Sequence, residues 1–169
     1  MNSPKIIETD RTYLRAWTKD DFNLVNSIFG DPDVMANIGN GKPLSTGQVS
    51  LLLTFFLDHY KTYGFGPWAV VKKENMEVIG INGIKYLPNF SHPDFGFAFI
   101  KDEWSKGFGF ETSTAVLQYA QQNLNLKKIG ATVSPKNIPS KKLLEKLGLK
   151  YHETVTRDSL PIEVYYLKS

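Results

Sequence analysis

The sequence predicts a mixed α/β fold, and two kinds of segment predict it. Strand patterns at 67–73 and 77–87, and again at 149–157 and 162–168, are separated by short turns that favour hairpins. Hairpins pair their strands antiparallel, whereas the strand–helix–strand unit that spans 94–133 allows a parallel pair. The order of segments predicts seven strands and about four helices.

The first half of the chain alternates between strand and helix patterns. Residues 12–17 alternate in polarity and are rich in strand formers. Thr18 is a candidate N-cap with Asp21 three residues later, and an apolar helical face continues from there to Phe29. Residues 30–43 are rich in Gly, Pro and Asn and predict a loop. A second helix is expected at 45–63, with Gly64 as its stop.

In the second half, strands are predicted at 67–73, 77–87 and 94–101, and a turn follows that contains two glycines. The next segment, 110–124, has helical periodicity. A strand at 127–133 and a short helix at 138–147 come before the closing hairpin. Gly148 stands at the end of that short helix.

Composition excludes several classes of function. The 169 residues suit one domain, residues 1–169, and the net charge of +3 is too small to indicate a nucleic-acid binder. Without cysteine there is neither a disulfide nor a thiolate nucleophile, and the three histidines lack metal-ligand spacing. No signal core or membrane-length apolar run is visible, so we expect a cytoplasmic protein without a membrane partner.

The turn between the strand at 94–101 and the following helix is suited to bind an anion. Gly107 and Gly109 leave room beside the backbone N–H groups of a helix start, and Lys106 adds positive charge. A pyrophosphate would fit, although an ordinary tight turn explains the glycines equally well. A Rossmann fingerprint is disfavoured because Thr112 occupies the third glycine position, and no P-loop motif is present.

Five segments, in order, resemble the GCN5-related N-acetyltransferases (GNAT), most closely the RimJ/RimL-like ribosomal-protein N-terminal acetyltransferases. They are ETDRTYLRAWTKDDF, GDPDVMANIGNGKP, PWAVVKKENMEVIGINGI, EWSKGFGFETS and VSPKNIPSKKLLEKLGL. The fourth resembles the pyrophosphate loop of the branch, and the fifth its N-x-x-S-x-x-x-x-E-K-x-G element. The resemblance covers nearly the full chain.

The resemblance implies a mainly antiparallel sheet in which two parallel strands, 94–101 and 128–134, splay apart to admit the pantetheine arm of acetyl-CoA. By this analogy, the backbone of Ile100 and Lys101 pairs with pantetheine, and Asn137 lies near the point where the strands part. The remaining expected cofactor-binding residues are Trp104, Lys106, Gly107, Phe108, Gly109, Phe110 and Ser140. Segment 31–43 and the second helix are expected to form the acceptor side, with Tyr60, Tyr63 and Phe65 near its mouth.

Asp94 and Ser140 are the two catalytic candidates. The amine must be neutral to attack a thioester, and Asp94, at the start of its strand, is a candidate base or amine-binding group. Many family members carry a Tyr acid where this chain has Leu144, so the resemblance gives Ser140 a place near the sulfur instead. Ordinary surface roles remain open for both residues.

Three other residues are weaker candidates for proton transfer. Glu103 precedes the turn and serves either as a base or as a cap. His92 has a suitable intrinsic pKa but lies in a Ser-His-Pro loop typical of the surface. Glu111 lies in the first helical turn, where the helix dipole favours a carboxylate for structural reasons.

The sequence therefore predicts an acetyl-CoA-dependent N-acetyltransferase that uses no metal. The expected acceptor is a primary amine, either a protein N-terminus or a small molecule, and a homodimer is one expected assembly. The absent Tyr at position 144 and the short acid at 94 also allow a catalytically weak acyl-CoA-binding or sensing module.

Overall fold

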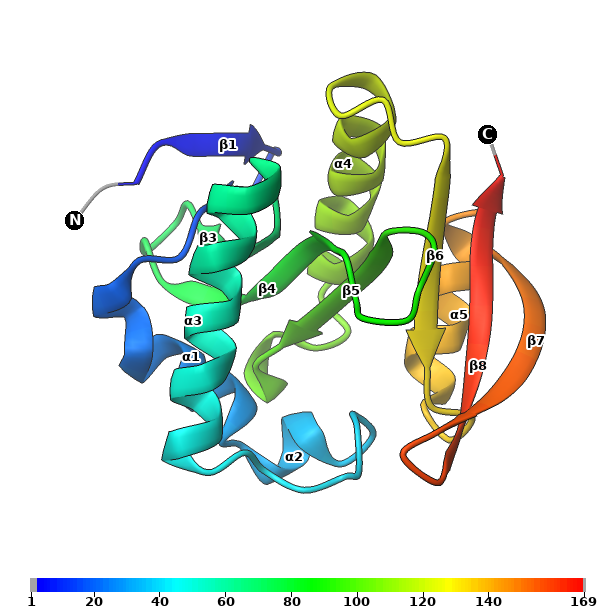
Figure 1. The fold of residues 1–169 in the computed structure, drawn as a ribbon. Helices are drawn as coiled ribbons and strands as arrows, with labels where there is room; N and C mark the ends of the chain where they lie inside the picture. Colours follow the sequence, from blue (N-terminus) through cyan, green and yellow to red (C-terminus); the bar gives the residue numbers. More distant parts are fainter. Residues whose placement is uncertain (1–2, 169) are drawn as a thin grey trace.

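The computed structural model describes residues 3–168, which form one eight-stranded sheet with helices on both faces (Figure 1). The strands are β1 (Lys5–Glu8), β2 (Thr12–Arg15), β3 (Pro67–Lys72), β4 (Val78–Lys85), β5 (Asp94–Phe99), β6 (Lys128–Val133), β7 (Lys150–Arg157) and β8 (Leu160–Lys168). The helices are α1 (Phe22–Phe29), α2 (Pro32–Met35), α3 (Thr46–Tyr63), α4 (Phe108–Gln122) and α5 (Ile138–Lys146). Two 3-10 turns, η1 (Lys19–Asp21) and η2 (Lys101–Glu103), complete the elements.

The structure adds one strand and one helix to those predicted from the sequence. Strand β1 is only four residues long, has an irregular register against β2 and lies at the edge of the sheet, so it lacks a clear alternating pattern. Helix α2 is a single turn inside the segment predicted to be a loop. The side chain of Asp31 accepts hydrogen bonds from the backbone of Asp33 and Val34, and Pro32 occupies the first turn.

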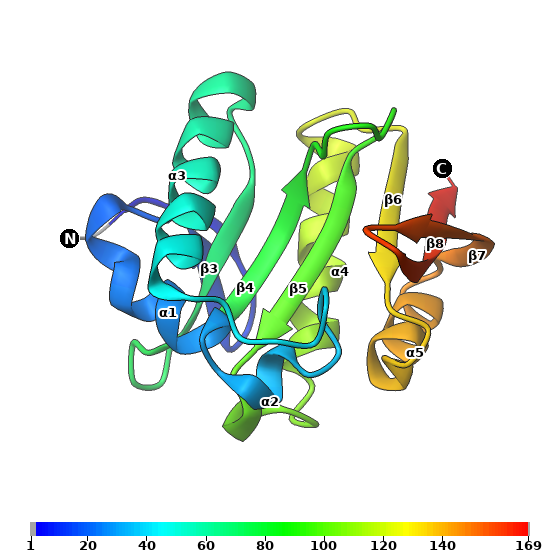
Figure 2. The ribbon, with the colours of Figure 1, turned by 60° about the horizontal axis from the view of Figure 1, so that its bottom comes forward.

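The strand order is β1-β2-β3-β4-β5-β6-β8-β7, and the only parallel neighbours among these eight strands are β5 and β6. All the other pairs run antiparallel, which confirms the predicted mixed and mainly antiparallel sheet. The parallel pair is short, because β6 is in register with β5 only at Asp94 and Phe95. Beyond Phe95 the two strands separate, as the view in Figure 2 shows.

Two hydrophobic cores hold the helices against the two faces of the sheet. One core joins α4 and α5 to the sheet through residues such as Val116 and Leu144. The other core joins α1, α2 and α3 to the opposite face, where Ala98 of β5 contributes. Residues of β5 therefore alternate between the two cores, and the separation of β5 from β6 opens a passage between the two helix layers.

Within residues 3–168, no helix is long and apolar enough to cross a lipid bilayer. The same residues contain no group of three or more His, Asp or Glu side chains arranged to hold a metal ion.

Candidate acetyl-CoA site

A cavity of about 280 Å³ lies where β5 and β6 separate. Four parts of the chain line it: α2 and the residues after it, the end of β5, the turn into α4, and the start of α5. The lining residues are Asp33, Val34, Asn37, Ile38, Phe97, Ala98, Phe99, Glu103, Trp104, Ser105, Gly107, Phe108, Gly109, Asn137, Pro139, Ser140 and Leu143. Segments far apart in the sequence thus meet at the open end of the sheet.

The hydrogen bonds between β5 and β4 determine which backbone groups of β5 face the cavity. The N–H of Ile100 donates to the carbonyl of Ile79 at 3.0 Å, and the ladder continues antiparallel from there. In such a ladder, alternate residues direct their backbone groups to the same side. Ala98 therefore also pairs with β4, whereas Phe97 and Phe99 direct their N–H and C=O groups toward β6.

Because β6 has already diverged at this point, the backbone at Phe97 and Phe99 has no strand partner in residues 3–168. The carbonyl of Phe99 accepts a hydrogen bond of 2.7 Å from the indole N–H of Trp104. The N–H groups of both phenylalanines and the carbonyl of Phe97 remain as an open strand edge along the cavity. An extended amide-bearing chain, such as a pantetheine arm, can add to such an edge.

The glycine turn has the conformation of an anion-binding helix start. Gly107 is the N-cap of α4 with φ of 86°, a left-handed conformation that side chains disfavour. The N–H groups of Phe108, Gly109 and Phe110 belong to the first helical turn and have no intrahelical carbonyl to bond. A Cβ at Gly109 would lie 3.1 Å from Leu143, so glycine there also permits close approach of α5. The turn fits the pyrophosphate of CoA, since its exposed donors and helix dipole favour negative charge.

Thr112, in the position of the third Rossmann glycine, fixes the start of α4. It is fully buried, and its hydroxyl donates to the carbonyl of Phe108 at 2.7 Å. The buried amide of Asn82 on β4 donates to the hydroxyls of Thr112 and Ser113, both at 2.9 Å. These contacts attach the first turns of α4 to the centre of the sheet, so the free N–H groups of the turn have a rigid support.

Glu103, a weaker candidate for the base, is held by two lysines. It is buried, with Lys72 at 2.8 Å from one carboxylate oxygen and Lys106 at 3.1 Å from the other. The hydrogen bond from Lys72 lowers the pKa of Glu103, and this effect exceeds the opposing effect of burial, with Lys106 adding to the lowering. A carboxylate that is paired in this way is a poor proton acceptor at neutral pH, and it keeps the ammonium group of Lys106 beside the glycine turn.

Helix α5 brings Asn137 and Ser140 to the side of the cavity opposite β5. The side chain of Asn137 caps the helix by accepting a hydrogen bond of 3.2 Å from the backbone of Ser140. Its amide also lies 3.5 Å from the carbonyl of Asn37, in the segment after α2. Leu144, at the position where the resemblance implies a Tyr, is 2% exposed and packs in the core.

The structure brings most of the expected cofactor-binding residues to the cavity, but not all of them. Trp104, Gly107, Phe108, Gly109, Asn137 and Ser140 line it. Lys106 and Phe110 are next to the turn, with Lys106 tied to Glu103 and Phe110 covered by the ammonium of Lys146 at 4.2 Å. Ile100 and Lys101 are not among the lining residues: the N–H of Ile100 is bonded to β4, and the backbone carbonyl of Lys101 accepts a hydrogen bond of 3.1 Å from the N–H of Trp104.

Asp94, the expected base, lies at the closed end of the parallel pair rather than on the cavity wall. It is buried and bonded to Lys85 and Thr132. His92 is also buried, and its pKa is lowered by burial and by the nearby charge of Lys128. Thus the structure does not bring Asp94 and Ser140 together around one open space.

Sequence reasoning missed the two phenylalanines of the open edge and Pro139 and Leu143 of α5. Nothing in the pattern distinguishes Phe97 and Phe99 from other core aromatics, because their role depends on where β6 leaves β5. Segment 31–43 was expected on the acceptor side, and four of its residues line the cavity. Tyr60, Tyr63 and Phe65 are not among the lining residues, and they pack around His59 and Tyr86 or against β3 instead.

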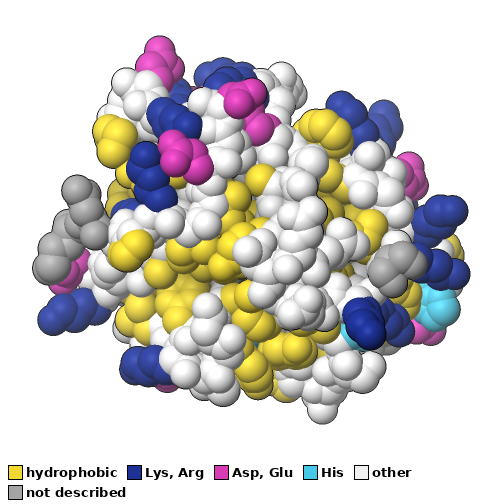
Figure 3. All heavy atoms as spheres, turned by 90° about the horizontal axis from the view of Figure 1, so that it is seen from above, with side chains coloured by type: hydrophobic (Ala, Val, Ile, Leu, Met, Phe, Trp, Pro, Cys, Tyr) yellow, Lys and Arg dark blue, Asp and Glu magenta, His cyan; other side chains and the backbone are white. Residues whose placement is uncertain are grey.

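A second hollow, of about 410 Å³, lies at the other end of β6 and β8. It is lined by Lys127, Lys128, His152, Tyr166, Leu167 and Lys168. Basic side chains gather on the right-hand rim of Figure 3, the side on which β8 lies in Figure 1. The described lining residues of this hollow include no helix start, so the cavity between β5 and α5 is the better candidate for the cofactor.

Comparison with known proteins agrees with this fold. A family model described as an acetyltransferase (GNAT) domain matches residues 11–150. An uncharacterized N-acetyltransferase of Bacillus subtilis, YoaA, is 30% identical over 147 residues, which are 86% of this chain and 82% of the relative. The solved acetyltransferase of Agrobacterium tumefaciens superimposes with a TM-score of 0.87 at 23% identity, over 100% of this chain and 96% of that one.

A further solved structure is the spermidine N-acetyltransferase of Vibrio cholerae in complex with CoA and spermine. It is similar with a TM-score of 0.75 at 18% identity, over 93% of this chain and 95% of that one. At such identity the likeness shows the fold alone. The family model, in contrast, spans most of the chain and includes the strand edge, the glycine turn and the cap of α5. The chain belongs to the GNAT family of acetyltransferases, enzymes whose acetyl donor is acetyl-CoA.

Proposed function

We propose that this chain transfers acetyl from acetyl-CoA to a primary amine, the acceptor being a protein N-terminal α-amine or a small molecule. The observation that carries the proposal is the open edge of β5 at Phe97 and Phe99. This edge runs toward the glycine turn at the start of α4, and Ser140 lies on the opposite wall of the same cavity. A thioester on an extended, pyrophosphate-bearing arm suits this combination of a strand edge and an anion-binding turn.

The binding roles follow from the direction of the backbone groups. Phe97 and Phe99 would pair with the amide-bearing arm of the cofactor. This differs from the expected pairing through Ile100 and Lys101, whose backbone carbonyls accept hydrogen bonds from the N–H groups of Glu103 and Trp104. The first N–H groups of α4 would hold the pyrophosphate, with Lys106 supplying additional charge. Trp104, 44% exposed and held by the carbonyl of Phe99, would form a wall of the cavity.

Acetyl-CoA supplies an activated thioester, and the chain must supply a proton to the departing sulfur. Ser140 and Ser105 carry the only hydroxyl groups among the lining residues of the described chain. Ser140 is the candidate of the two because it lies in the first turn of α5, on the side of the cavity opposite the open edge of β5. We therefore assign its Oγ the role of a relay: the hydroxyl donates its proton to the departing thiolate as it takes up the proton that the attacking amine loses. A thiolate with a pKa near that of cysteine, about 8.5, needs little help.

The cavity offers no free carboxylate for removing a proton from the amine. Asp33 and Glu103 are the acids among its described lining residues, and each is paired with lysine. An α-amino group, with a pKa of about 8, presents far more neutral amine at pH 7 than a lysine, with a pKa of about 10.4. The site therefore favours acceptors of low pKa, in agreement with a protein N-terminus. Asp94 remains a candidate for binding or deprotonating the amine from the far side of the passage.

The alternative, a catalytically weak acyl-CoA-binding or sensing module, is favoured by one observation. Leu144 lies in the core, at the position where the resemblance implies a Tyr acid, and a leucine there donates no proton to the sulfur. The two functions differ in whether an amine accelerates thiol release from acetyl-CoA.

The decisive experiment measures thiol release from acetyl-CoA with a panel of peptides, amino compounds and polyamines. We expect peptides or amino compounds of low pKa to give the fastest release, and S140A to lower kcat by about tenfold, as loss of one hydrogen bond to a charged group does. Ser50→Ala, at an exposed position on α3, is the matched control and should behave like the unaltered protein. Tight CoA binding without acceleration by any amine would instead support the sensing module.

A further inference from the structure

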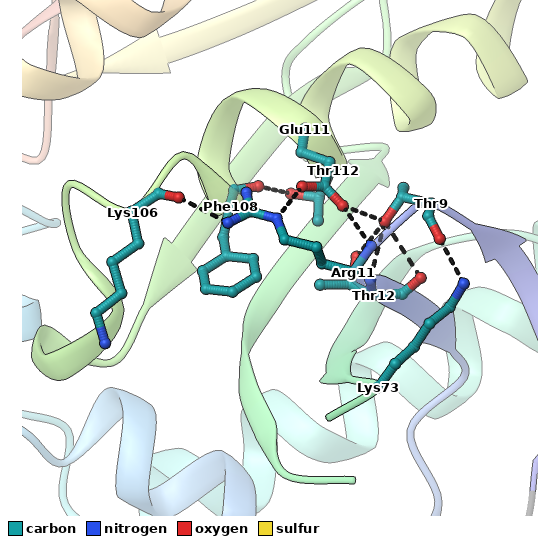
Figure 4. A network of polar contacts seen from close by, with 8 residues as sticks. All are labelled: Thr9, Arg11, Thr12, Lys73, Lys106, Phe108, Glu111 and Thr112. Atoms are coloured by element: carbon teal, nitrogen blue, oxygen red, sulfur yellow. Dashed lines mark hydrogen bonds and ion pairs between the residues drawn. The ribbon is translucent and has the colours of Figure 1, made fainter. Parts of the chain in front are cut away.

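The carboxylate of Glu111, in the first turn of α4, is bound by the turn between β1 and β2 (Figure 4). Glu111 accepts a hydrogen bond of 2.6 Å from the hydroxyl of Thr9 and one of 2.9 Å from the backbone N–H of Arg11. Its other oxygen lies 2.6 Å from Nε of Arg11. Three donors from one end of the chain thus converge on a residue about 100 positions away.

The guanidinium group of Arg11 also contacts the glycine turn itself. One terminal nitrogen donates to the carbonyl of Lys106 at 2.9 Å, and the group lies over the ring of Phe108 at 4.2 Å from its centroid. A Cβ added at Gly107 would lie 3.3 Å from the other terminal nitrogen. Arg11 therefore contacts the residues on both sides of Gly107 and the carboxylate one turn into the helix.

These contacts solve two problems for a turn that binds an anion. A carboxylate in the first turn of α4 would repel a pyrophosphate, and the ion pair with Arg11 compensates its charge. Burial alone would raise the pKa of Glu111, but the hydrogen bonds from Thr9 and Arg11 outweigh burial and lower it. The bond to the carbonyl of Lys106 also fixes the peptide before Gly107, which helps to set the direction of the N–H groups that follow.

We propose that Arg11 is a positioning residue for the pyrophosphate-binding turn, acting through Glu111 and the carbonyl of Lys106 rather than by contacting the anion. The proposal rests on the proposed function only in assigning the glycine turn to the pyrophosphate of CoA. It gives a specific role to residues 9–11, the segment between β1 and β2, which contributes no lining residue to the cavity. The segment acts as a brace that keeps the turn in its binding conformation.

A direct role in binding phosphate is the rival explanation, and Glu111 separates the two. If charge alone mattered, E111Q would remove a negative charge and release Arg11, and CoA would bind more tightly. If Arg11 braces the turn, E111Q loosens the brace and CoA binds more weakly, although the site has become more positive. The two explanations thus predict opposite signs for one substitution.

The experiment measures the dissociation constants of CoA and of pantetheine, which lacks the pyrophosphate, for the full chain without any acceptor. We expect E111Q and Arg11→Gln each to weaken CoA binding by about tenfold, the effect of one lost charge-assisted contact, and to leave pantetheine binding unchanged. Arg11→Lys should recover only part of the loss, because lysine cannot bond Glu111 and the carbonyl of Lys106 with a rigid fork. Asp10→Asn, an exposed neighbour in the same turn, is the matched control and should bind CoA normally.

Hydrogen exchange of the amides of residues 111 and 112, which close the first turn of α4, gives a second readout, and it should become faster in E111Q and in Arg11→Gln. Equal or tighter CoA binding by E111Q would overturn the proposal, as would equal losses for CoA and pantetheine, which would indicate general destabilisation. The proposed function fails separately, if the unaltered protein binds CoA but acetylates no amine. That result would not contradict the positioning role of Arg11.

Discussion

Asp94 and Lys85 form an ion pair across the ladder of β4 and β5, with 3.1 Å between Oδ2 and Nζ. The other oxygen of Asp94 accepts a hydrogen bond of 3.2 Å from the hydroxyl of Thr132 on β6. The carboxylate thus joins three strands at the point where the parallel pair ends. This arrangement supports a structural role for Asp94. Rate measurements on variants test whether Asp94 also acts in catalysis.

If Asp94 takes a proton from the amine, Asp94→Asn should lower kcat/KM most at low pH, where the amine is largely protonated. The measurement is the pH–rate profile of acetyl transfer. Lys85→Met is the matched control, because it breaks the same ion pair and leaves the carboxylate in place. If both variants lose the same activity at every pH, Asp94 acts by joining the strands and not as a base.

Replacement of Gly107 should weaken CoA binding beyond the effect of backbone strain. Gly107→Ala and Gly64→Ala both place a side chain in the left-handed region, at φ of 86° and 76°, and each should cost about 1 kcal/mol of stability. Only Gly107→Ala alters the anion-binding turn, and Gly107→Val should have a larger effect. Calorimetric titration with CoA distinguishes them, and similar CoA affinities for Gly107→Ala and Gly64→Ala would contradict the assigned role of the turn.

His59 should make the free energy of unfolding decrease below about pH 6.5, the ordinary pKa of histidine. Its ring is buried and bonded on both nitrogens, to the carbonyl of Phe65 at 2.6 Å and to the N–H of Tyr86 at 2.9 Å. Burial lowers the pKa of His59, because protonation would desolvate a charge and remove the acceptor for Tyr86.

The direction of this change in stability follows from comparing proton binding by the folded and the unfolded chain. Above pH 6.5 the ring is neutral in both states and the stability is full. As the pH falls below 6.5, the unfolded chain takes up a proton that the folded chain does not, and stability declines by up to about 1.4 kcal/mol per pH unit. Urea unfolding between pH 5 and 8 measures this slope. His59→Gln should reduce it.

Substitutions that break the ion pair of Arg15 and Asp21 should lower the free energy of unfolding more than most substitutions outside the cavity. The two side chains form a two-pronged contact, at 2.8 and 2.9 Å, and are about one-tenth exposed. Asp21 also accepts a hydrogen bond of 2.7 Å from the backbone of Thr18. Asp21→Ala leaves a mostly buried guanidinium without its partner and should destabilise the protein by about 3 kcal/mol.

Thermal or urea unfolding checks this value. The matched control is Asp58→Ala, which breaks the exposed ion pair of Asp58 and Lys61 on α3. That loss should cost less than about 1 kcal/mol, because solvent screens an exposed pair. Equal losses at Asp21 and Asp58 would contradict the importance assigned to burial.

Much of the fold could be predicted from local patterns. Thr18 and Asp21 form the expected capping box, and Gly64 ends α3 in a left-handed conformation. These features depend on residues close together in sequence, where capping and backbone preference act. The short elements β1 and α2 were not predicted. Each has four residues, and a segment of that length shows too few repeats of a polarity pattern to distinguish a strand or a helix from a loop.

The sequence by itself determined the order of most elements, the glycine turn and the resemblance to an acetyltransferase, because each is encoded in contiguous residues. Only the tertiary structure decided that β6 leaves β5 after Phe95, that the open edge is therefore at Phe97 and Phe99, and that Asp94 is bonded to Lys85. It also joined Arg11 to Glu111 beside the turn. These relationships depend on where distant strands and helices meet, and the hydrogen-bonding capacity of a single residue does not specify its partner.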